Sequence, residues 1–345
     1  MALSNFVLER GGVMALGTLV LWAFLDVFSR YGVLELRLHP WSFASLQMVV
    51  AGIGLLLMGG RGSTSSWRTL RHPLTWAIGV LRVTKDVLFI LSLTMITATE
   101  ATFLESLDLI FALLLVWVFL GRKLNIRDLP GTALVCAALT YLILQTDGGF
   151  MNPAIWLMSA AAVCLALMTL LTEIHDENHK AVSLRARCRV TGVVSLVTGL
   201  LFVAMMFVVD GLTLIWPSLT QGDHIFNAIV REVLPPSALL HSATMITAIV
   251  VGLLLRAPVM YLTFSSIRLI KTEAYLMIMT LLPFATMTVE TVAGSFGLLD
   301  TSTLALDDVL AGMVIVAGSA LTVFLRREED GPTIAPVYQE PPTDR

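Results

Sequence analysis

The chain consists of long apolar segments separated by short polar connectors. A helix needs about 20 mainly apolar residues to cross the hydrocarbon core of a bilayer, and it satisfies its own backbone hydrogen bonds there. The segments of about this length predict an all-α integral membrane protein with ten transmembrane helices. Their expected limits are 12–34, 42–59, 74–95, 98–119, 129–146, 153–173, 187–209, 239–264, 271–293 and 304–325.

Composition and charge placement agree with this picture. The chain is 57% hydrophobic and only 14% charged, unlike a water-soluble domain with a charged shell. Lys and Arg concentrate in alternate connectors, which by the positive-inside rule places both termini in the cytoplasm. No basic soluble module indicates nucleic-acid binding. We therefore expect a multi-pass protein of the bacterial inner membrane.

A short motif repeats between the two halves of the chain. The sequence TEA at 99–101 recurs at 272–274, and further matches follow at the same offset. The offset carries the fourth span onto the ninth, so the two halves run in opposite directions as a five-plus-five inverted repeat. We expect a cytoplasmic N-terminus at 1–11, a first repeat at 12–146, a linker at 147–152, a second repeat at 153–325 with an external loop at 210–236, and a disordered cytoplasmic tail at 326–345.

Ionisable side chains occur within the expected spans. Burying them in a bilayer costs a few kcal/mol each, so they usually face a bundle interior, a partner or a water-filled path. The third and fourth spans form a hairpin with a very short connector, and residues equally far from its turn lie at similar depth. This places Arg82 level with Asp108 and Lys85 level with Glu105. Helical spacing also puts Asp86 on the face that carries Arg82 and Lys85.

The second half contributes Arg256, which lies near the middle of the eighth span and either reaches a carboxylate of the other half or awaits a substrate anion. Pro283 is a candidate hinge, because a proline inside a span frees backbone carbonyls. The cationic and acidic groups balance, which suits a zwitterionic or weakly charged solute. The candidate substrate-binding residues are Arg82, Lys85, Asp86, Glu105, Asp108, Arg256, Trp22, Asp26 and Tyr261.

Several alternatives remain open at this point. The same charges also fit a permanently closed salt-bridge network in a non-transporting structural or regulatory membrane protein. A buried carboxylate can carry a proton, so proton-coupled transport, uniport and exchange all fit.

Catalytic and metal-binding patterns are weak in this sequence. The HDENH sequence at 175–179 has two His at i and i+4 but is not HExxH, and we expect a solvated polar loop there. Cys136, Cys164 and Cys188 lack metal-ligand spacing. We expect neither a cofactor nor an enzyme.

Three stretches carry a family resemblance: LVLWAFLDVFSR in the first span, HPWSFASLQ entering the second, and LSLTMITATEATFLESLDLIFALLLVWVFLGRKLNIRDLPGTALVCAALTYLIL across the fourth and fifth. With them the chain resembles the EamA family of the drug/metabolite transporter superfamily over about residues 12–325. The resemblance implies ten spans in an inverted repeat and export of a small metabolite, such as an amino acid, by alternating access. The expected partners are this solute, the lipid bilayer and, in the coupled alternative, protons; the chain is expected to be a monomer or a homodimer.

Overall fold

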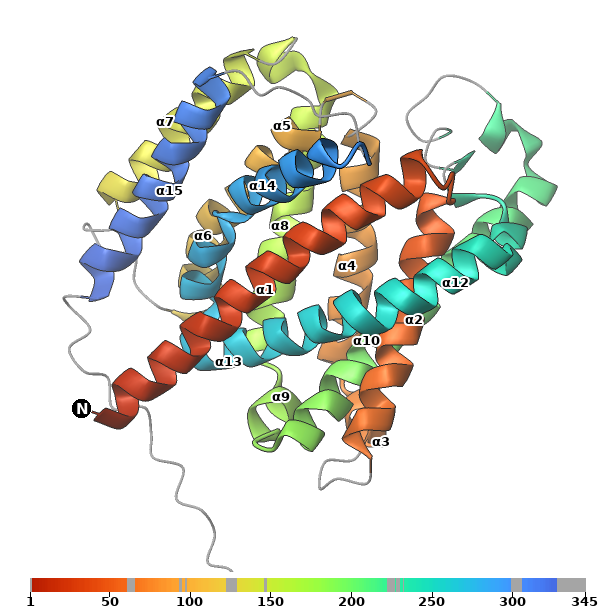
Figure 1. The fold of residues 1–345 in the computed structure, drawn as a ribbon, viewed down its shortest axis with the longest axis horizontal. Helices are drawn as coiled ribbons and strands as arrows, with labels where there is room; N and C mark the ends of the chain where they lie inside the picture. The colour runs from red at the N-terminus through yellow and green to blue at the C-terminus, as the bar shows by residue number, and fades with distance from the viewer. Residues whose placement is uncertain are drawn as a thin grey trace, which may run out of the picture.

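The structure is a computed structural model that describes residues 2–60, 66–92, 95–96, 98–121, 129–145, 148–221, 227, 230–231, 233–298 and 306–327. All regular elements in these ranges are helical (Figure 1). The α-helices are α1 Ala2–Leu34, α2 Pro40–Gly59, α3 Ser66–Arg71, α4 Pro73–Ser92, α5 Ala98–Glu105, α6 Leu107–Leu120, α7 Leu129–Gln145, α8 Pro153–Glu173, α9 Asp176–Lys180, α10 Leu184–Ile215, α12 Ser242–Val251, α13 Ala257–Met279, α14 Leu282–Ser295 and α15 Leu306–Arg327. The remaining helices are the 3-10 helices η2 Gly149–Met151, η3 Pro217–Thr220 and η4 Pro236–Leu240, and the π-helix η5 Gly252–Arg256.

The all-helical class is confirmed, and the described chain contains six helical stretches long and apolar enough to cross a membrane. They are Arg10–Val33, Pro40–Gly59, Ala101–Leu120, Pro153–Glu173, Leu184–Ile215 and Ser242–Met279. Among the other expected spans, α4 carries three charged side chains, and α7 and α15 offer shorter apolar stretches. The count of ten spans, the inverted repeat and the cytoplasmic termini remain predictions.

Several helices begin where the sequence supplies a cap followed by proline. The side chain of Asn152 accepts a hydrogen bond of 2.9 Å from the backbone N–H of Ala154, and Pro153 occupies the first turn of α8. His39 and Pro40 play the same parts at the start of α2. Proline suits this position because the N–H it lacks would have no partner inside the helix. These signals fix the start of both helices.

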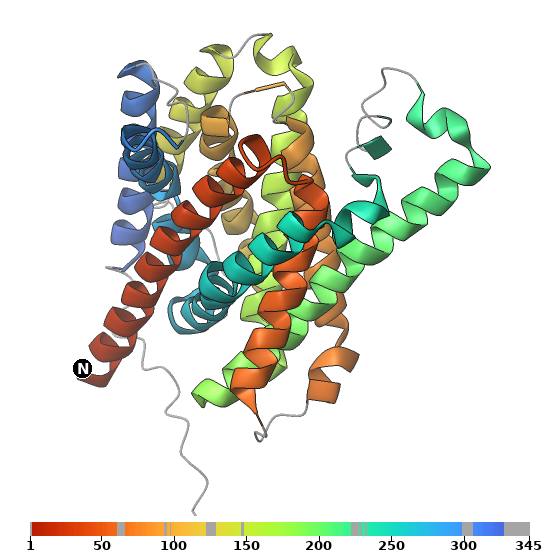
Figure 2. The same ribbon diagram turned by 45° about the vertical axis from the view of Figure 1, so that its right-hand side comes forward.

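The helices pack in pairs that bring distant parts of the chain together. α2 packs along α10, α4 along α8, and α1 along α13. α7 packs against α15, and this pair lies at one side of the molecule, while α1 crosses the face of the remaining bundle (Figures 1 and 2). Each of these four pairs joins a helix of the first half of the chain to one of the second.

Helix ends differ from the expected boundaries at several places. α1 begins at Ala2, ten residues before the expected span at 12–34, and α10 extends to Ile215, into the segment expected to be an external loop. Gly149–Met151 forms a 3-10 helix within the expected linker, of which residue 147 lies outside the described residues. Residues 328–345 of the expected tail also lie outside them.

The helices that contain the repeated TEA sequences are both interrupted. α5 ends at Glu105 and α6 begins at Leu107, with the N–H of Ser106 bonded to the carbonyl of Phe103. The corresponding part of the second half turns at Thr280 and continues as α14. Discontinuous helices at matching positions of two repeats commonly border a transporter's binding site.

We predict that Gly199→Ala destabilises the protein because α2 and α10 touch backbone to backbone there. A Cβ at Gly199 would lie 2.7 Å from the backbone nitrogen of Val49. Overpacking of this kind typically costs about 1–3 kcal/mol, so the midpoint of thermal unfolding in detergent should fall.

Gly211, on the same helix, provides the matched control. Nothing lies within 4 Å of a Cβ placed at Gly211, so Gly211→Ala should leave the midpoint unchanged or raise it through better helix propensity. Equal midpoints for Gly199→Ala and Gly211→Ala would contradict the close packing of α2 on α10.

Candidate functional site

A cavity of about 780 Å³ lies between α1, α2, α4, α8, α10, α13 and the break regions of α5/α6 and α13/α14. This volume is typical of small-molecule sites. Its lining contains both signs of charge, which is unusual inside an apolar bundle. The charged lining residues are Asp26, Arg30, Arg82, Lys85, Asp86, Glu105, Asp108, Arg256 and Glu290. Within the described chain, α7 and α15 contribute nothing to the lining.

The expected pair between α4 and the following helix forms. The Nζ atom of Lys85 lies 2.5 Å from Oε1 of Glu105 and 3.8 Å from Oδ1 of Asp86. Lys85 also lies 4.7 Å from the centroid of the Phe89 ring. The hairpin therefore places these two helices in the register that equal distance from the turn predicts.

Arg82 does not pair with Asp108, the residue expected at its level. Its Nε atom lies 3.5 Å from Oδ2 of Asp86, one turn along the same helix. The break at Ser106 separates Asp108 from the helical face of Glu105, so the two acids do not continue one ladder. Asp108 is only 5% exposed and has no ion pair with a residue that the structure describes.

Arg256 approaches the same part of the cavity from the second half. Its Cζ atom and that of Arg82 each lie 4.9 Å from the centroid of the Trp22 ring. A guanidinium this close to an indole ring gains a cation–π contact. The only hydrogen bond of Arg256 to a described residue runs from Nε to the Sδ atom of Met48, at 2.9 Å, and a thioether is a weak acceptor.

Two charged residues of α1 line the cavity, Asp26 and Arg30. Asp26 lines the cavity without an ion pair to the described part of the chain. Arg30, one turn further, reaches Glu290 on α14 at 2.6 Å. This pair joins the two halves of the chain across the cavity.

The remaining candidates lie in different environments. Pro283 is buried, lines the cavity and occupies the first turn of α14, directly after the break at Thr280. Tyr261 is absent from the lining and packs instead against an apolar cluster that includes Met48 and Phe264. Tyr261 was therefore the wrong tyrosine to expect on the cavity wall.

Tyr275 is the tyrosine that lines the cavity. It is buried, and its hydroxyl lies 3.3 Å from that of Thr263. Tyr275 directly follows the second TEA sequence, and Thr102, which directly follows the first, also lines the cavity. The repeat itself was therefore the signal that could have identified this position.

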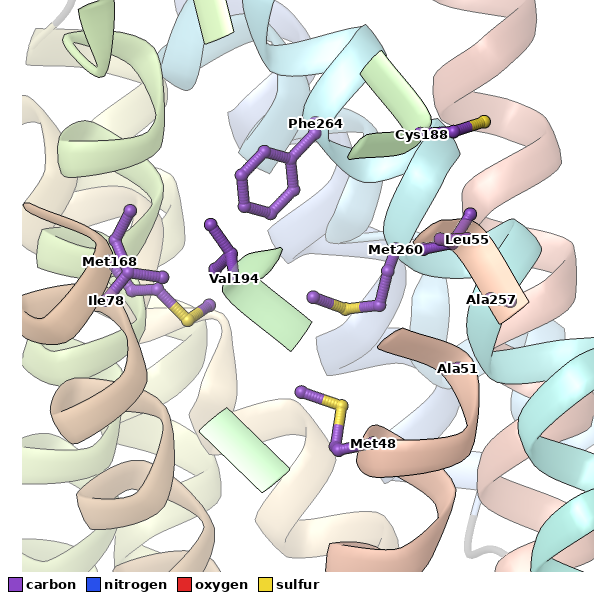
Figure 3. Close-up of a cluster of buried hydrophobic side chains, with 10 residues drawn as sticks. All are labelled: Met48, Ala51, Leu55, Ile78, Met168, Cys188, Val194, Ala257, Met260 and Phe264. Atoms are coloured by element: carbon purple, nitrogen blue, oxygen red, sulfur yellow. The ribbon is translucent and has the colours of Figure 1, made fainter. Parts of the chain in front are cut away.

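Methionines form much of the apolar wall. Met48, Met168 and Met260 come from α2, α8 and α13 and point toward a common space, with Phe264 beside them (Figure 3). Methionine is flexible and polarisable, so such a wall can adapt to different apolar groups. The cavity thus combines fixed charges with an adaptable apolar surface.

The HDENH sequence is not the solvated loop that we expected. It forms the short helix α9 with His175 at its N-cap, and His175 is fully buried. The Nε2 atom of His175 lies 3.0 Å from the hydroxyl of Thr75, which itself donates to the carbonyl of Thr69. His175 must then donate from Nε2, and its ring stacks 4.6 Å from that of His72. In the residues that the structure covers, no cluster of His, Cys, Asp or Glu could hold a metal ion.

Because of this burial, we expect the stability of the protein to fall in acid. Burial and the neighbouring His72 lower the pKa of His175 from 6.5 to about 4. Between these two pH values the side chain binds a proton in the unfolded chain but not in the folded chain. The free energy of unfolding should therefore be greatest above pH 6.5 and fall as the pH drops toward 4. Thermal unfolding of His175→Gln should show a smaller loss over this range, whereas His241→Gln, at an exposed histidine, should behave as the parent. Identical pH profiles for the parent and His175→Gln would contradict the assignment.

Comparison with known proteins agrees with this architecture. Residues 9–144 match the family model described as the EamA-like transporter family. Over these residues the chain is similar to the EamA-like transporter family. The match runs from within α1 to near the end of α7, and these helices contribute most of the charged lining of the cavity.

A solved structure is similar to this chain over both of its halves. It is titled only "Crystal structure of protein", has a TM-score of 0.57 and 17% sequence identity, and the alignment covers 93% of this chain and 99% of that one. At this identity the likeness shows the fold alone. No curated protein matches the chain.

Proposed function

We propose that the protein is a secondary transporter that moves a small organic solute across the membrane by alternating access. The observation that carries the proposal is the charged cavity itself. A purely structural network would pair its charges and exclude space, whereas here Asp26, Asp108 and Arg256 border the cavity without an ion pair to any described residue. Uncompensated charges inside a membrane protein are costly and are typical of substrate or ion paths.

The construction of the cavity supports movement between two states. Helices of both halves line it, and the breaks at Ser106 and Thr280 interrupt the helices on either side. Two bundles that rock about such a site open it to each side in turn. The Arg30–Glu290 pair would then open and close as the two halves separate and rejoin.

Direction and coupling are further parts of the proposal. Family resemblance favours export from the cytoplasm, and the charge distribution favours cytoplasmic termini. We assign proton coupling to Asp108, because a buried carboxylate without an ion pair can alternate between a protonated and an ionised form as the cavity changes sides. Asp26, which is half-buried, is a second carboxylate of the cavity without an ion pair to a described residue.

Proteoliposomes test the proposal directly. Vesicles that contain the full chain and a panel of unlabelled amino acids, organic acids, nucleosides and nucleotide sugars should exchange at least one of them for its labelled form outside, with and without a pH gradient. Vesicles without protein provide the background. Absence of exchange for the whole panel, by protein shown to be folded by its thermal unfolding, would overturn the transport proposal in favour of a structural protein.

Labelling separates an open cavity from a closed network. In a variant whose native Cys136, Cys164 and Cys188 are replaced by Ser, a cysteine at Ser106 on the cavity wall should react with a membrane-impermeant maleimide from one side. A cysteine at Ala112, which is fully buried in the apolar core, should resist. Resistance at both positions would favour the closed network.

A further inference from the structure

Two arginines from opposite halves of the chain meet on one indole ring. The Cζ atoms of Arg82 and Arg256 each lie 4.9 Å from the centroid of Trp22, so they are no more than twice this distance apart. The side chains are only 5% and 6% exposed. Two buried like charges repel each other and lose hydration. A folded protein keeps such a pair only where other groups offset this cost.

The compensation within the protein is incomplete. Arg82 reaches Asp86 at 3.5 Å, but its buried Nε atom makes no hydrogen bond. Arg256 donates only to the thioether of Met48 among the described residues. Guanidinium groups present five N–H donors in a planar fork that matches a carboxylate. The two arginines therefore offer unused donors to an anionic group in the cavity.

The local backbone of Arg256 explains its position. Pro258 has no N–H to bond the carbonyl of Leu254, and the preceding residues Gly252–Arg256 form a π-helix. Gly252 permits close approach to α2, since a Cβ there would lie 3.0 Å from the carbonyl oxygen of Gln47. Such π segments are frequent at functional sites. Here the π segment ends at the residue that faces Trp22.

The wall beside this pair is apolar and adaptable. Met48 contacts Arg256 directly, and Met48, Met168 and Met260 surround a common space (Figure 3). Met279 also lines the cavity. Methionine-rich surfaces accept apolar groups of different shape because they repack at low cost.

From these observations we propose that Arg82 and Arg256 bind the carboxylate of the transported solute, while the methionine wall holds its apolar tail. The substrate class is then amphipathic organic acids, with or without an amino group, selected by the carboxylate and tolerant of the tail. This inference rests on the transport function proposed above. The balance of charges in the sequence predicted a zwitterionic or weakly charged solute. Here the carboxylate alone is the group that the protein recognises.

Binding to the purified full chain in detergent tests the head group. The probes are L-leucine and 4-methylpentanoate, which carry the carboxylate, and their primary amides, which do not. Stabilisation against thermal unfolding as a function of concentration gives the affinity of each. Both acids should bind about tenfold or more tightly than their amides, since the amides cannot form hydrogen bonds between charged groups with the guanidinium groups. Equal affinities of acid and amide, or no binding by either acid, would overturn the inference.

A variant pair locates the effect. Arg256→Gln should lose the preference for acids, whereas Arg185→Gln, at an exposed arginine outside the cavity, should keep it. Retained preference in a folded Arg256→Gln variant would overturn the site, and Arg82→Gln provides the same test should the first variant fail to fold. If acids bind but do not exchange in vesicles, the transport function is refuted and the carboxylate site is supported. If acids and amides exchange equally, transport is supported and the carboxylate site is refuted.

Discussion

Vesicles that contain the Asp108→Asn variant should lose transport driven by a pH gradient while they retain exchange of labelled for unlabelled solute. Asn resembles the protonated carboxyl group in shape and cannot release a proton. Exchange requires only that the loaded cavity change sides, whereas net transport requires that Asp108 also bind and release its proton. Gradient-driven flux should fall by about 100-fold or more, the size of effect expected when an obligatory charged group is removed.

The matched control for this experiment is Asp176→Asn. Asp176 is an exposed carboxylate on α9, outside the cavity, and its loss should leave both activities intact. Full gradient-driven flux in Asp108→Asn would refute the coupling role of Asp108 and direct attention to Asp26. Loss of both exchange and gradient-driven flux would instead identify Asp108 as part of the solute site.

Local patterns predicted much of the fold and one contact of the site. Runs of apolar residues located the helices because membrane spans obey a simple length rule. The pairing of Lys85 with Glu105 followed from distance along a hairpin with a short turn. The same reasoning failed for Arg82 and Asp108, since it assumed an unbroken helix and no proline marks the turn at Ser106.

Contacts between the two halves lay beyond the reach of sequence reasoning. Arg30 pairs with Glu290 on a helix 260 positions away, and no periodicity relates the two. The choice of Tyr275 over Tyr261 depends on the backbone between them, which is non-helical at Lys271. Neither a proline nor a glycine occurs at this kink, so the sequence did not show that the helix changes direction there.

The burial of α9 shows a second limit. A run of polar residues such as HDENH usually indicates solvent, yet His175 and Asn178 are buried against neighbouring helices. The amide nitrogen of Asn178 donates to the carbonyl of Phe264 at 3.4 Å. Buried polar side chains can donate hydrogen bonds to backbone carbonyls that lack a partner where helices meet. Which carbonyls lack a partner depends on the tertiary fold.

Replacing Lys85 with Met should destabilise the protein by about 3 kcal/mol, because it leaves the largely buried carboxylate of Glu105 without its cation at 2.5 Å. Removing both partners in Lys85→Met/Glu105→Gln should restore most of this loss, since no unpaired charge then remains. Thermal or denaturant unfolding in detergent gives the two values, and a double-mutant cycle gives the coupling between the side chains.

Solute exchange by the same variants then tests whether Lys85 and Glu105 serve stability alone or also act on the solute. If Lys85 and Glu105 serve stability alone, the double variant should be nearly as stable as the parent and should exchange solute at the same rate. In a transporter whose cavity balances its charges against those of the solute, the double variant should be stable and yet exchange solute more slowly, because Arg82 and Asp86 lose their charged neighbours on the wall. A stable double variant with unchanged exchange would remove Lys85 and Glu105 from the solute path.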